Sequence, residues 1–526
     1  MEYLIDRLRA ALRTAGIPAT EADFAGIVEK GFLNRFPEVE HLLDAVDHEQ
    51  LPDSLDAASL PPAASPPNGD LPTSDDPTTI SGIATLLQRQ AISPVELVEQ
   101  ALERISQYDS ELNVFQIVMA ESALADARVA AAELAAGHAR SPLHGVPIAV
   151  KDLFDVAGYP TAAGSRIRAG VIAATDATVV KRLRAAGAII IGKTRMSEFA
   201  YSPGSNNAHY GSTANPYHRQ RDSGGSSSGS GVATATGMAF AAIGTDTGGS
   251  IRIPAAHCGI VGLKPTYGRV SLAGGFPLSW SLDHAGPMTR TVTDAALLLS
   301  VIAGPDPHDS RTLRPAPDVT VGGLTAGVRH TRVGLLTADG SGQALASTDE
   351  LLAMQRAAEA LAGQGAIVTP IEMPELEELR LLNQALLAME AAALHLPWLR
   401  TRLDDYGEFM RHRILAAFIY APVDPTRVQQ ARAILRRRVA MRLAEIDLLI
   451  TPVTPGPAPA LGIPTPTSFT GPWNFLGWPA ISLPTGLGND GVPRAVQFIA
   501  RPWNEPLLLR AAYAAEQVLG RVTPFL

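Results

Sequence analysis

The chain has 526 residues, 46% of them hydrophobic and 18% charged, which provides material for a large core and excludes disorder over most of its length. Its 43 basic and 52 acidic side chains give a net charge of −9 at pH 7, which excludes a bulk attraction to nucleic acid or to an anionic membrane surface. Cys258 is the only cysteine, so an intrachain disulfide and a Cys-x-x-Cys metal or redox site are excluded too.

The N-terminus indicates where the protein works. It begins Met-Glu-Tyr-Leu-Ile-Asp, which lacks the apolar core and the small-residue cleavage site of a secretory signal. No stretch reaches the ~20 apolar residues that span a bilayer. We therefore expect a cytoplasmic protein with neither a membrane nor a nucleic acid as its partner.

Composition divides the chain into three parts. Apolar residues recur at helical spacing from Leu4 to about Val46, which predicts two or three short helices. A Pro- and Ser-rich stretch follows and reads as a linker. We assign residues 1–60 to an N-terminal helical appendage, 61–79 to the linker and 80–526 to the main domain. The appendage fits a dimerisation or packing role, as in a homodimer, and equally a tail that only covers an apolar patch.

The main domain alternates helical and strand patterns. Helices are expected at 80–88, begun by Thr79 or Ser81, at 93–108, capped by Ser93 with Pro94 in the first turn, and at 121–136. Residues 146–150 read as a short buried strand that places Lys151 at its carboxyl end. Residues 176–186 predict an amphipathic helix, and 188–191 a wholly apolar strand.

The same alternation continues toward the C-terminus. Further helices are expected at 227–237 and 292–302, and further strands at 240–244, 260–263, 333–336 and 447–451. Residues 375–442 are helical in pattern and read as an insertion on the substrate side. The predicted fold class is α/β, with a large mixed, mostly parallel central sheet covered by helices on both faces and a small N-terminal helical appendage.

Three short pieces of sequence carry the chemistry. They are His-Gly-Val-Pro-Ile-Ala-Val-Lys-Asp ending on Lys151 and Asp152, Gly-Gly-Ser-Ser-Ser-Gly-Ser at 224–230, and Asp-Thr-Gly-Gly-Ser-Ile-Arg at 246–252. Amide cleavage needs a nucleophile, a base that takes its proton, and donors for the oxyanion. The pieces offer one lysine as the base and two serines, set among glycines, that can carry a proton and attack a carbonyl.

The order and spacing of these pieces resemble the amidase signature family. The resemblance extends through 215–216, 253–256, 262–266 and 281–287, and through a C-terminal pattern at 474–479 and 491–493, so that about residues 80 to 520 are covered. It implies that Ser250 is the nucleophile, that Ser226 follows a cis peptide bond from Gly225 and bridges the proton, and that Lys151 is the base. It also implies hydrolysis of a small-molecule carboxamide, or a related amide-like bond, through an acyl-enzyme, without metal or cofactor.

The chemistry sets conditions on these residues. A lysine with an ordinary pKa of about 10.4 is protonated at neutral pH, so Lys151 can be a base only if burial or a cation lowers its pKa. Gly248 and Gly249 allow a tight turn in which the amides of Thr247, Gly248, Gly249 and Ser250 converge on one oxygen, as an oxyanion hole requires. Ser227, Asp246 and Arg252 are expected to support the site. Asp246 and Arg252 would hold the loop through charge-assisted bonds, the alternative being a plain surface salt bridge.

Three of the motifs, taken singly, allow another interpretation. A Gly-Ser run is usually a linker, but 224–230 leads directly into an apolar helix and a strand. Residues 187–194 fit the pattern of a phosphate-binding loop, but 188–191 are apolar and mostly β-branched and belong inside a strand. Residues 225–229 fit Gly-x-Ser-x-Gly, which would nominate Ser227 as a nucleophile, but the polar stretch before them is no elbow strand.

The main alternative function is that of the catalytic component of a glutamine-dependent amidotransferase, which works on tRNA within a complex. That reading expects an acidic residue ahead of Asn474, where this sequence has Thr467, although Arg413 could still meet a carboxylate. Which amide is the substrate stays open, because we expect the pocket walls to come from the region after Glu375. Four tryptophans are candidates for an acyl tunnel or for ordinary core: Trp280, Trp473, Trp478 and Trp503.

Overall fold

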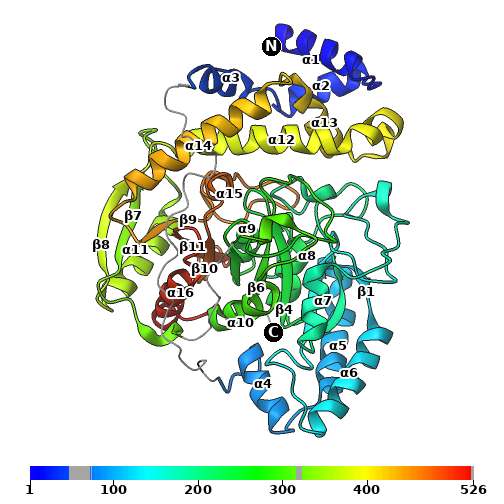
Figure 1. The fold of residues 1–526 in the computed structure, drawn as a ribbon, viewed down its shortest axis with the longest axis vertical. Helices are drawn as coiled ribbons and strands as arrows, with labels where there is room; N and C mark the ends of the chain where they lie inside the picture. The colour runs from blue at the N-terminus through cyan, green and yellow to red at the C-terminus, as the bar shows by residue number, and fades with distance from the viewer. Residues whose placement is uncertain (47–71, 73, 315–322, 523–526) are drawn as a thin grey trace.

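The computed structural model describes residues 1–46, 72, 74–314 and 323–522. Within them, eleven strands form one sheet that runs through the middle of the molecule (Figure 1). In spatial order the strands are β1 (Phe115–Val118), β3 (Ile189–Thr194), β2 (Pro147–Lys151), β4 (Ala241–Asp246), β6 (His284–Thr289), β5 (Val261–Lys264), β10 (Ala480–Leu487), β11 (Pro493–Ala500), β9 (Leu448–Pro452), β7 (Arg332–Ala338) and β8 (Ile367–Glu372).

The sheet is mixed, as the sequence predicts, but parallel pairs do not predominate. β2 pairs in parallel with β3 and β4, and β7 with β8 and β9. The other six neighbouring pairs within the described residues are antiparallel. The reversals come from β1, β6, β10 and β11, strands that the apolar pattern did not reveal.

Helices cover both faces of the sheet. Ile148 and Val150 of β2 pack into the larger core, with α7 (Thr178–Ala185) and α10 (Val292–Ile302). Ala149, which points the other way, packs into a second core with α5 (Pro94–Leu112) and α8 (Ser228–Thr236). The large-core side also carries α11 (Thr348–Ala362) and α16 (Glu505–Leu519), and the other side carries α6 (Ala120–Ala135) and α9 (Arg252–His257).

The predicted helix signals act as expected. Thr79 caps α4 (Ile80–Gln88) through its hydroxyl, and Ser93 forms a capping box with Glu96 at the start of α5. α5 runs beyond the predicted end, to Leu112, because Asn113 provides the left-handed stop at φ 56°. The stretch that fits a phosphate-loop pattern is mostly inside β3, so that motif is rejected.

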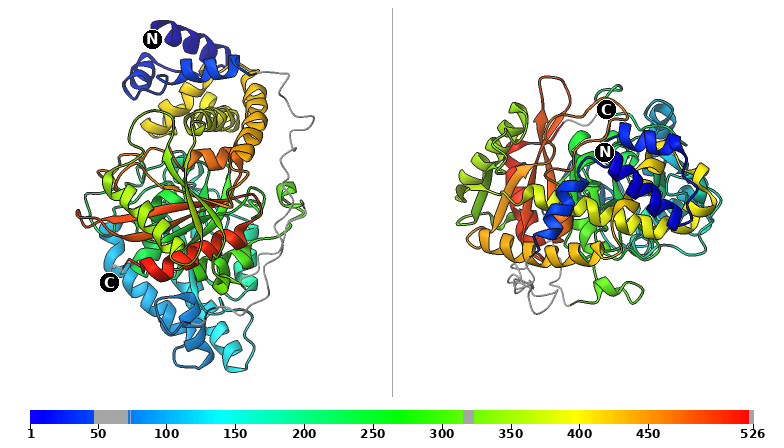
Figure 2. Two further views of the ribbon diagram at one scale, coloured as in Figure 1. Left: turned by 90° about the vertical axis from the view of Figure 1, so that its left-hand side faces the viewer. Right: turned by 90° about the horizontal axis from the view of Figure 1, so that it is seen from above.

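The N-terminal helices lie on the side of the molecule away from α4 (Figures 1 and 2). They are α1 (Glu2–Thr14), α2 (Glu21–Glu29) and α3 (Phe36–Asp44), and they pack on the helices of the predicted insertion, α12 (Leu376–Thr401), α13 (Glu408–Ala416) and α14 (Asp424–Arg442). Ion pairs join Asp23 to Arg411 and Lys30 to Glu408 across this contact. The predicted linker at 61–79 falls largely outside the described residues, and the domain boundaries stay predictions. Among the helices described here, none is long and apolar enough to cross a membrane.

Candidate active site

Lys151 is the last residue of β2, and its amine is buried completely. Because β2 and β4 are parallel neighbours, their carboxyl ends meet at one edge of the sheet. Lys151 Nζ lies 2.6 Å from Ser226 Oγ and 2.8 Å from Thr245 Oγ1 of β4. Burial lowers the pKa of Lys151 to about 7. The carboxylates of Asp246 and Asp283 have the opposite, smaller effect, because they favour the charged form of the amine. The condition that the sequence set on this lysine is met.

The serine-rich segment lies beside this amine, ahead of α8. The peptide bond from Gly225 to Ser226 is cis, as the family resemblance implies, and Ser226 is fully buried. A Cβ on Gly225 would come within 2.0 Å of the Gly204 carbonyl oxygen, so only glycine fits there. The Ser227 amide donates to the Ser250 carbonyl at 3.3 Å, which places the serine-rich segment against the predicted nucleophile loop.

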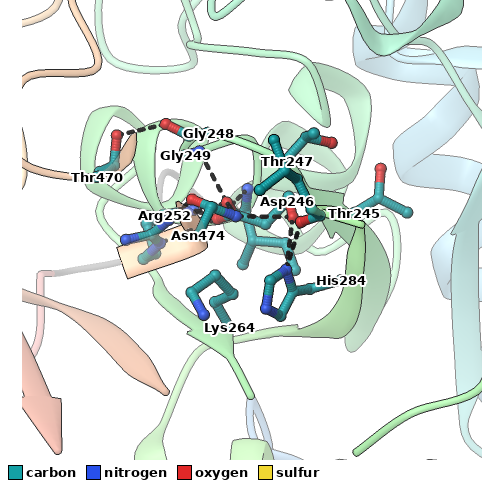
Figure 3. Close-up of polar contacts among 12 residues, drawn as sticks. Thr245, Asp246, Thr247, Gly248, Gly249, Arg252, Lys264, His284, Thr470 and Asn474 are labelled. Carbon is teal, nitrogen blue, oxygen red and sulfur yellow. Dashed lines mark hydrogen bonds and ion pairs between the residues drawn. The ribbon is translucent and has the colours of Figure 1, made fainter. Parts of the chain in front are cut away.

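Asp246, the last residue of β4, organises the nucleophile loop (Figure 3). Its carboxylate accepts the amides of Gly249 at 2.7 Å and Ile251 at 3.1 Å. It also accepts two bonds from the Arg252 guanidinium, at 3.0 and 2.9 Å. Both side chains are fully buried, so the surface salt bridge considered as an alternative is wrong. Burial would raise the pKa of Asp246, but Arg252 and Asn474 outweigh it and hold that pKa well below its usual range.

Two segments far along the chain complete this cluster. Asn474 of α15 (Gly471–Leu476) donates to the Asp246 carboxylate at 2.8 Å and to its carbonyl at 2.9 Å. Gln497 of β11 accepts from Arg252 at 2.6 Å. Thr470 donates to the Gly248 carbonyl at 2.6 Å (Figure 3). The loop is therefore held from three directions, by β4, α15 and β11.

The glycines of the loop are fixed by this arrangement. Gly249 has φ +137°, and a Cβ on it would lie 2.4 Å from Thr470 Oγ1. Its N–H already donates to Asp246, so any bond from Gly249 to an oxyanion would have to share that hydrogen. Ser250 itself is 7% exposed, so it is not completely enclosed, and a nucleophile must be accessible to its substrate.

A second buried lysine lies beneath the loop (Figure 3). Lys264 donates to the Trp478 carbonyl, and burial with Arg252 nearby holds its pKa well below its usual range. His284 binds the Leu282 and Asp246 carbonyls through Nδ1, and burial lowers its pKa well below its usual range. Neither residue bonds to Lys151 or to the predicted serines among the described contacts, and only His284 contacts the loop directly, through the Asp246 carbonyl.

A cavity of about 280 Å³ opens next to the lysine. Thr245 and Thr247 form part of its wall, and Phe276, Leu278 and Trp280 supply much of its apolar lining. Its lining residues lie between 153 and 311, so the expectation that the walls come from the region after Glu375 is wrong for this cavity. α12 instead approaches the loop from behind, where Asn383 donates to the Thr247 carbonyl at 3.4 Å.

The four tryptophans are mostly not tunnel residues. Trp280 lines the cavity and is 66% exposed. Trp473 and Trp478 are buried and pack on each other, with ring centroids 6.1 Å apart. Trp503 packs against the Arg269 guanidinium. Only Trp280 fits the tunnel interpretation, and the other three are structural.

Sequence reasoning missed several residues that the structure brings to the site. Thr245 directly precedes the predicted Asp246 piece and bonds Lys151. Asn474 belongs to the C-terminal pattern that carries the resemblance, which was the one available signal for it. Asp283 lies in another such piece, and its carboxylate accepts the Thr247 hydroxyl at 2.6 Å.

Comparison with known proteins agrees with the geometry. The family model described as Amidase matches residues 96–509. The chain belongs to the amidase family. It is thus a hydrolytic enzyme of the class that acts on amide C–N bonds.

Three relatives show how far the similarity extends. The chain is 37% identical to the A component of the glutamyl-tRNA(Gln) amidotransferase of Trichlorobacter lovleyi, over 84% of this chain and 96% of that protein. It is 38% identical to AtzE, a component of the 1-carboxybiuret hydrolase of a Pseudomonas species, over 79% and 93%. The solved structure of the peptide amidase from Stenotrophomonas maltophilia superposes with a TM-score of 0.75 at 32% identity, covering 86% of this chain and 99% of that one.

Proposed function

We propose that this amidase-family enzyme hydrolyses a carboxamide or related amide-like C–N bond through an acyl-enzyme on Ser250, with Ser226 as the proton bridge and Lys151 as the base. The observation that carries the proposal is the Lys151 amine, buried, 2.6 Å from Ser226 Oγ and with its pKa lowered to about 7. A fraction of this amine is neutral at neutral pH and can accept a proton.

The acylation half-reaction follows from this arrangement. The neutral Lys151 amine takes the proton of Ser226 while Ser226 takes the proton of Ser250, and the Ser250 oxygen attacks the substrate carbonyl. The tetrahedral intermediate then collapses, the C–N bond breaks, and the Lys151 ammonium returns its proton by way of Ser226 to the departing nitrogen. Ammonia or an amine leaves, and the acyl group stays on Ser250.

Deacylation reverses the relay. Water gives one proton to the regenerated Lys151 amine through Ser226 and attacks the acyl carbon. The acid then leaves as Ser250 recovers its proton. Thr245, bonded to Lys151 Nζ at 2.8 Å, holds the amine in place during both halves.

The oxyanion is assigned to the amides of Thr247, Gly248 and Gly249, with the Gly249 hydrogen shared with Asp246. One such donor typically contributes about 3 kcal/mol to the transition state. Ser227, Asp246 and Arg252 support the site without reacting, because they fix the loop and the start of α8.

The amidotransferase alternative is less well supported. Thr467, where that reading expects an acidic residue, lies close to the loop: its Cγ2 is 3.9 Å from the position of a Cβ on Gly248. Arg413 donates to the Tyr201 carbonyl at 2.9 Å and packs over the Tyr201 ring. A threonine cannot pair with the ammonium group of glutamine as a carboxylate would, so a small-molecule amide substrate is favoured. The cytoplasmic location and the homodimer stay predictions.

The test is turnover of a panel of aliphatic, aryl and glutamine amides by the purified chain. Ser250→Ala is expected to abolish release of acid and amine, and Lys151→Ala to reduce it at least a thousandfold. Ser300→Ala and Lys181→Ala alter exposed residues and should retain full activity. Robust turnover in either site variant overturns the proposal, and activity on glutamine alone that depends on added partner proteins would favour the amidotransferase.

A further inference from the structure

One buried carboxylate near the site has no part in the relay. Asp283 lies just before β6, is 7% exposed and lines the cavity. One of its oxygens accepts the Thr247 hydroxyl at 2.6 Å. The other accepts the backbone amides of Leu278 at 2.8 Å and Ser279 at 3.1 Å. Asp283 thus joins the nucleophile loop to the segment 278–283, which forms one wall of the cavity.

The same segment has a second anchor, on α12. Glu390 accepts the hydroxyls of Ser279 and Ser281 and the Ser281 amide. Asn383, two turns earlier on α12, reaches the Thr247 carbonyl. Thr247 is therefore held through its hydroxyl by Asp283 and through its carbonyl by α12, and the cavity wall is held by the two carboxylates.

Charges on several elements act on Asp283. Lys151 of β2, Glu390 of α12, Arg311 of η4 (Ser310–Thr312) and Tyr267 each interact with it electrostatically. Asp309, which also lines the cavity, is paired with Arg311. Burial raises the pKa of Asp283 to about 6 in spite of its three donors. The Asp283 carboxylate in turn favours the ammonium form of Lys151, which opposes the effect of burial on that amine.

We propose that Asp283 is a positioning residue of the catalytic site: it holds Thr247, and with it the loop 246–250, against the cavity wall, and its negative charge acts on Lys151. The inference rests on the proposed function and deepens it. The carboxylate sets the place of a predicted oxyanion donor and favours the ammonium form of the base, so its removal has two separable consequences.

The experiment uses a reagent that needs no substrate to be known. A small alkyl fluorophosphonate phosphonylates an activated serine with loss of fluoride, and peptide mapping locates the adduct. In the unmodified protein, labelling of Ser250 should accelerate with pH around a midpoint near 7. In Asp283→Asn, labelling at pH 9 should be at least ten times slower. The single amide oxygen is needed by the Leu278 and Ser279 amides, so an NH2 group, which cannot accept, faces the Thr247 hydroxyl. The midpoint should move to lower pH, because Lys151 loses a neighbouring negative charge.

Asp294→Asn is the matched control. Asp294 is buried too and accepts two backbone amides, those of Ile80 and Ser81, but it lies on α10 and joins it to α4. Its variant should label at the unmodified rate and midpoint. If Asp283→Asn does not fold, Thr247→Val tests the same contact, because it removes the Thr247 hydroxyl and keeps the Asp283 carboxylate. This variant should slow labelling at pH 9.

The outcomes separate the two proposals. If Ser250 of the unmodified protein is not labelled, the proposed function fails, and this inference fails with it. If Ser250 is labelled but Asp283→Asn keeps the same rate or the same midpoint, the role of Asp283 is overturned and the proposed function stands. Unchanged labelling in Thr247→Val also overturns the role of Asp283.

Discussion

Arg252 and Asp246 form a pair whose geometry a lysine cannot reproduce. Two guanidinium nitrogens bind the two carboxylate oxygens, and the third nitrogen reaches Gln497. Arg252→Lys should therefore leave part of a buried charge cluster without partners and lower the free energy of unfolding by about 3 kcal/mol. Urea denaturation measures the change.

The matched control is Arg332→Lys at the partly exposed ion pair with Asp447, where unfolding should change little because solvent screens the pair. An equal effect of both substitutions would show that the buried cluster does not stabilise the protein more than a surface pair does.

Gly249 is the glycine of the loop for which a side chain is least acceptable. Gly249→Ala should reduce kcat/KM at least a hundredfold, because φ +137° disfavours any Cβ and Thr470 occupies the space. Gly170→Ala is the control, since a Cβ there meets nothing within 4 Å. Unchanged kinetics in the Gly249 variant would mean that the loop is not held as described.

At this scale the sequence nominated residues that lie in short consecutive pieces and missed the partners that they meet from distant parts of the chain. Lys151, Ser226, Asp246 and Arg252 lie in short pieces with their own chemical character. Asn474 joins the cluster across more than two hundred residues, and nothing local marks its partner. The cluster exists because β4, α15 and β11 converge, which is a property of the folded chain.

For whole elements, the sequence revealed the strands with uninterrupted apolar runs and missed those that a proline interrupts. Strands such as β3, with continuous β-branched residues, were predicted, although β3 runs to Thr194, beyond the predicted end at 191. β6, β8 and β10 were missed because Pro287, Pro370 and Pro484 interrupt their apolar runs, a pattern that usually argues against a strand. β6 and β10 take part in four of the six described antiparallel pairs, whereas β8 pairs in parallel. The predicted balance of the sheet was therefore wrong, while its extent and helix layers were right.

The contact between the N-terminal helices and the insertion depends on a close approach of α2 to α13. A Cβ on Gly26 would lie 2.0 Å from the His412 ring, which is itself nearly buried. Gly26→Val should displace α2, lower the thermal midpoint by several degrees and expose residues 1–46 to limited proteolysis.

Val28→Ala, at an exposed position of the same helix, should leave both properties unchanged. If Gly26→Val digests at the unmodified rate, α2 does not pack on α13 as described, and the appendage would not be part of the compact structure.

Stability of the whole molecule should depend on Glu516, a buried carboxyl of α16 that accepts the Val292 amide. Burial raises its pKa to about 7, above the value of about 4.3 of an unfolded chain. The folded state therefore binds the proton more tightly, and the resulting stability is complete below pH 4.3 and lost as pH rises through 7. We compare the free energy of unfolding of Glu516→Gln with that of the unmodified protein. This difference should favour the variant more at pH 8 than at pH 4, by on the order of 2 kcal/mol.

Chemical denaturation at the two pH values measures this difference, with Glu121→Gln, at an exposed position, as the control. A difference that does not depend on pH would show that Glu516 is not protonated more readily in the folded state.

The most direct measurement is the pH dependence of kcat/KM on any amide that the protein hydrolyses. Lys151 must be neutral to act, and burial places its pKa at about 7, so kcat/KM should rise with pH through a single midpoint near 7 and level off above it. A profile that is flat from pH 5.5 to 9, or one that rises only near pH 10, would contradict a buried neutral lysine as the base.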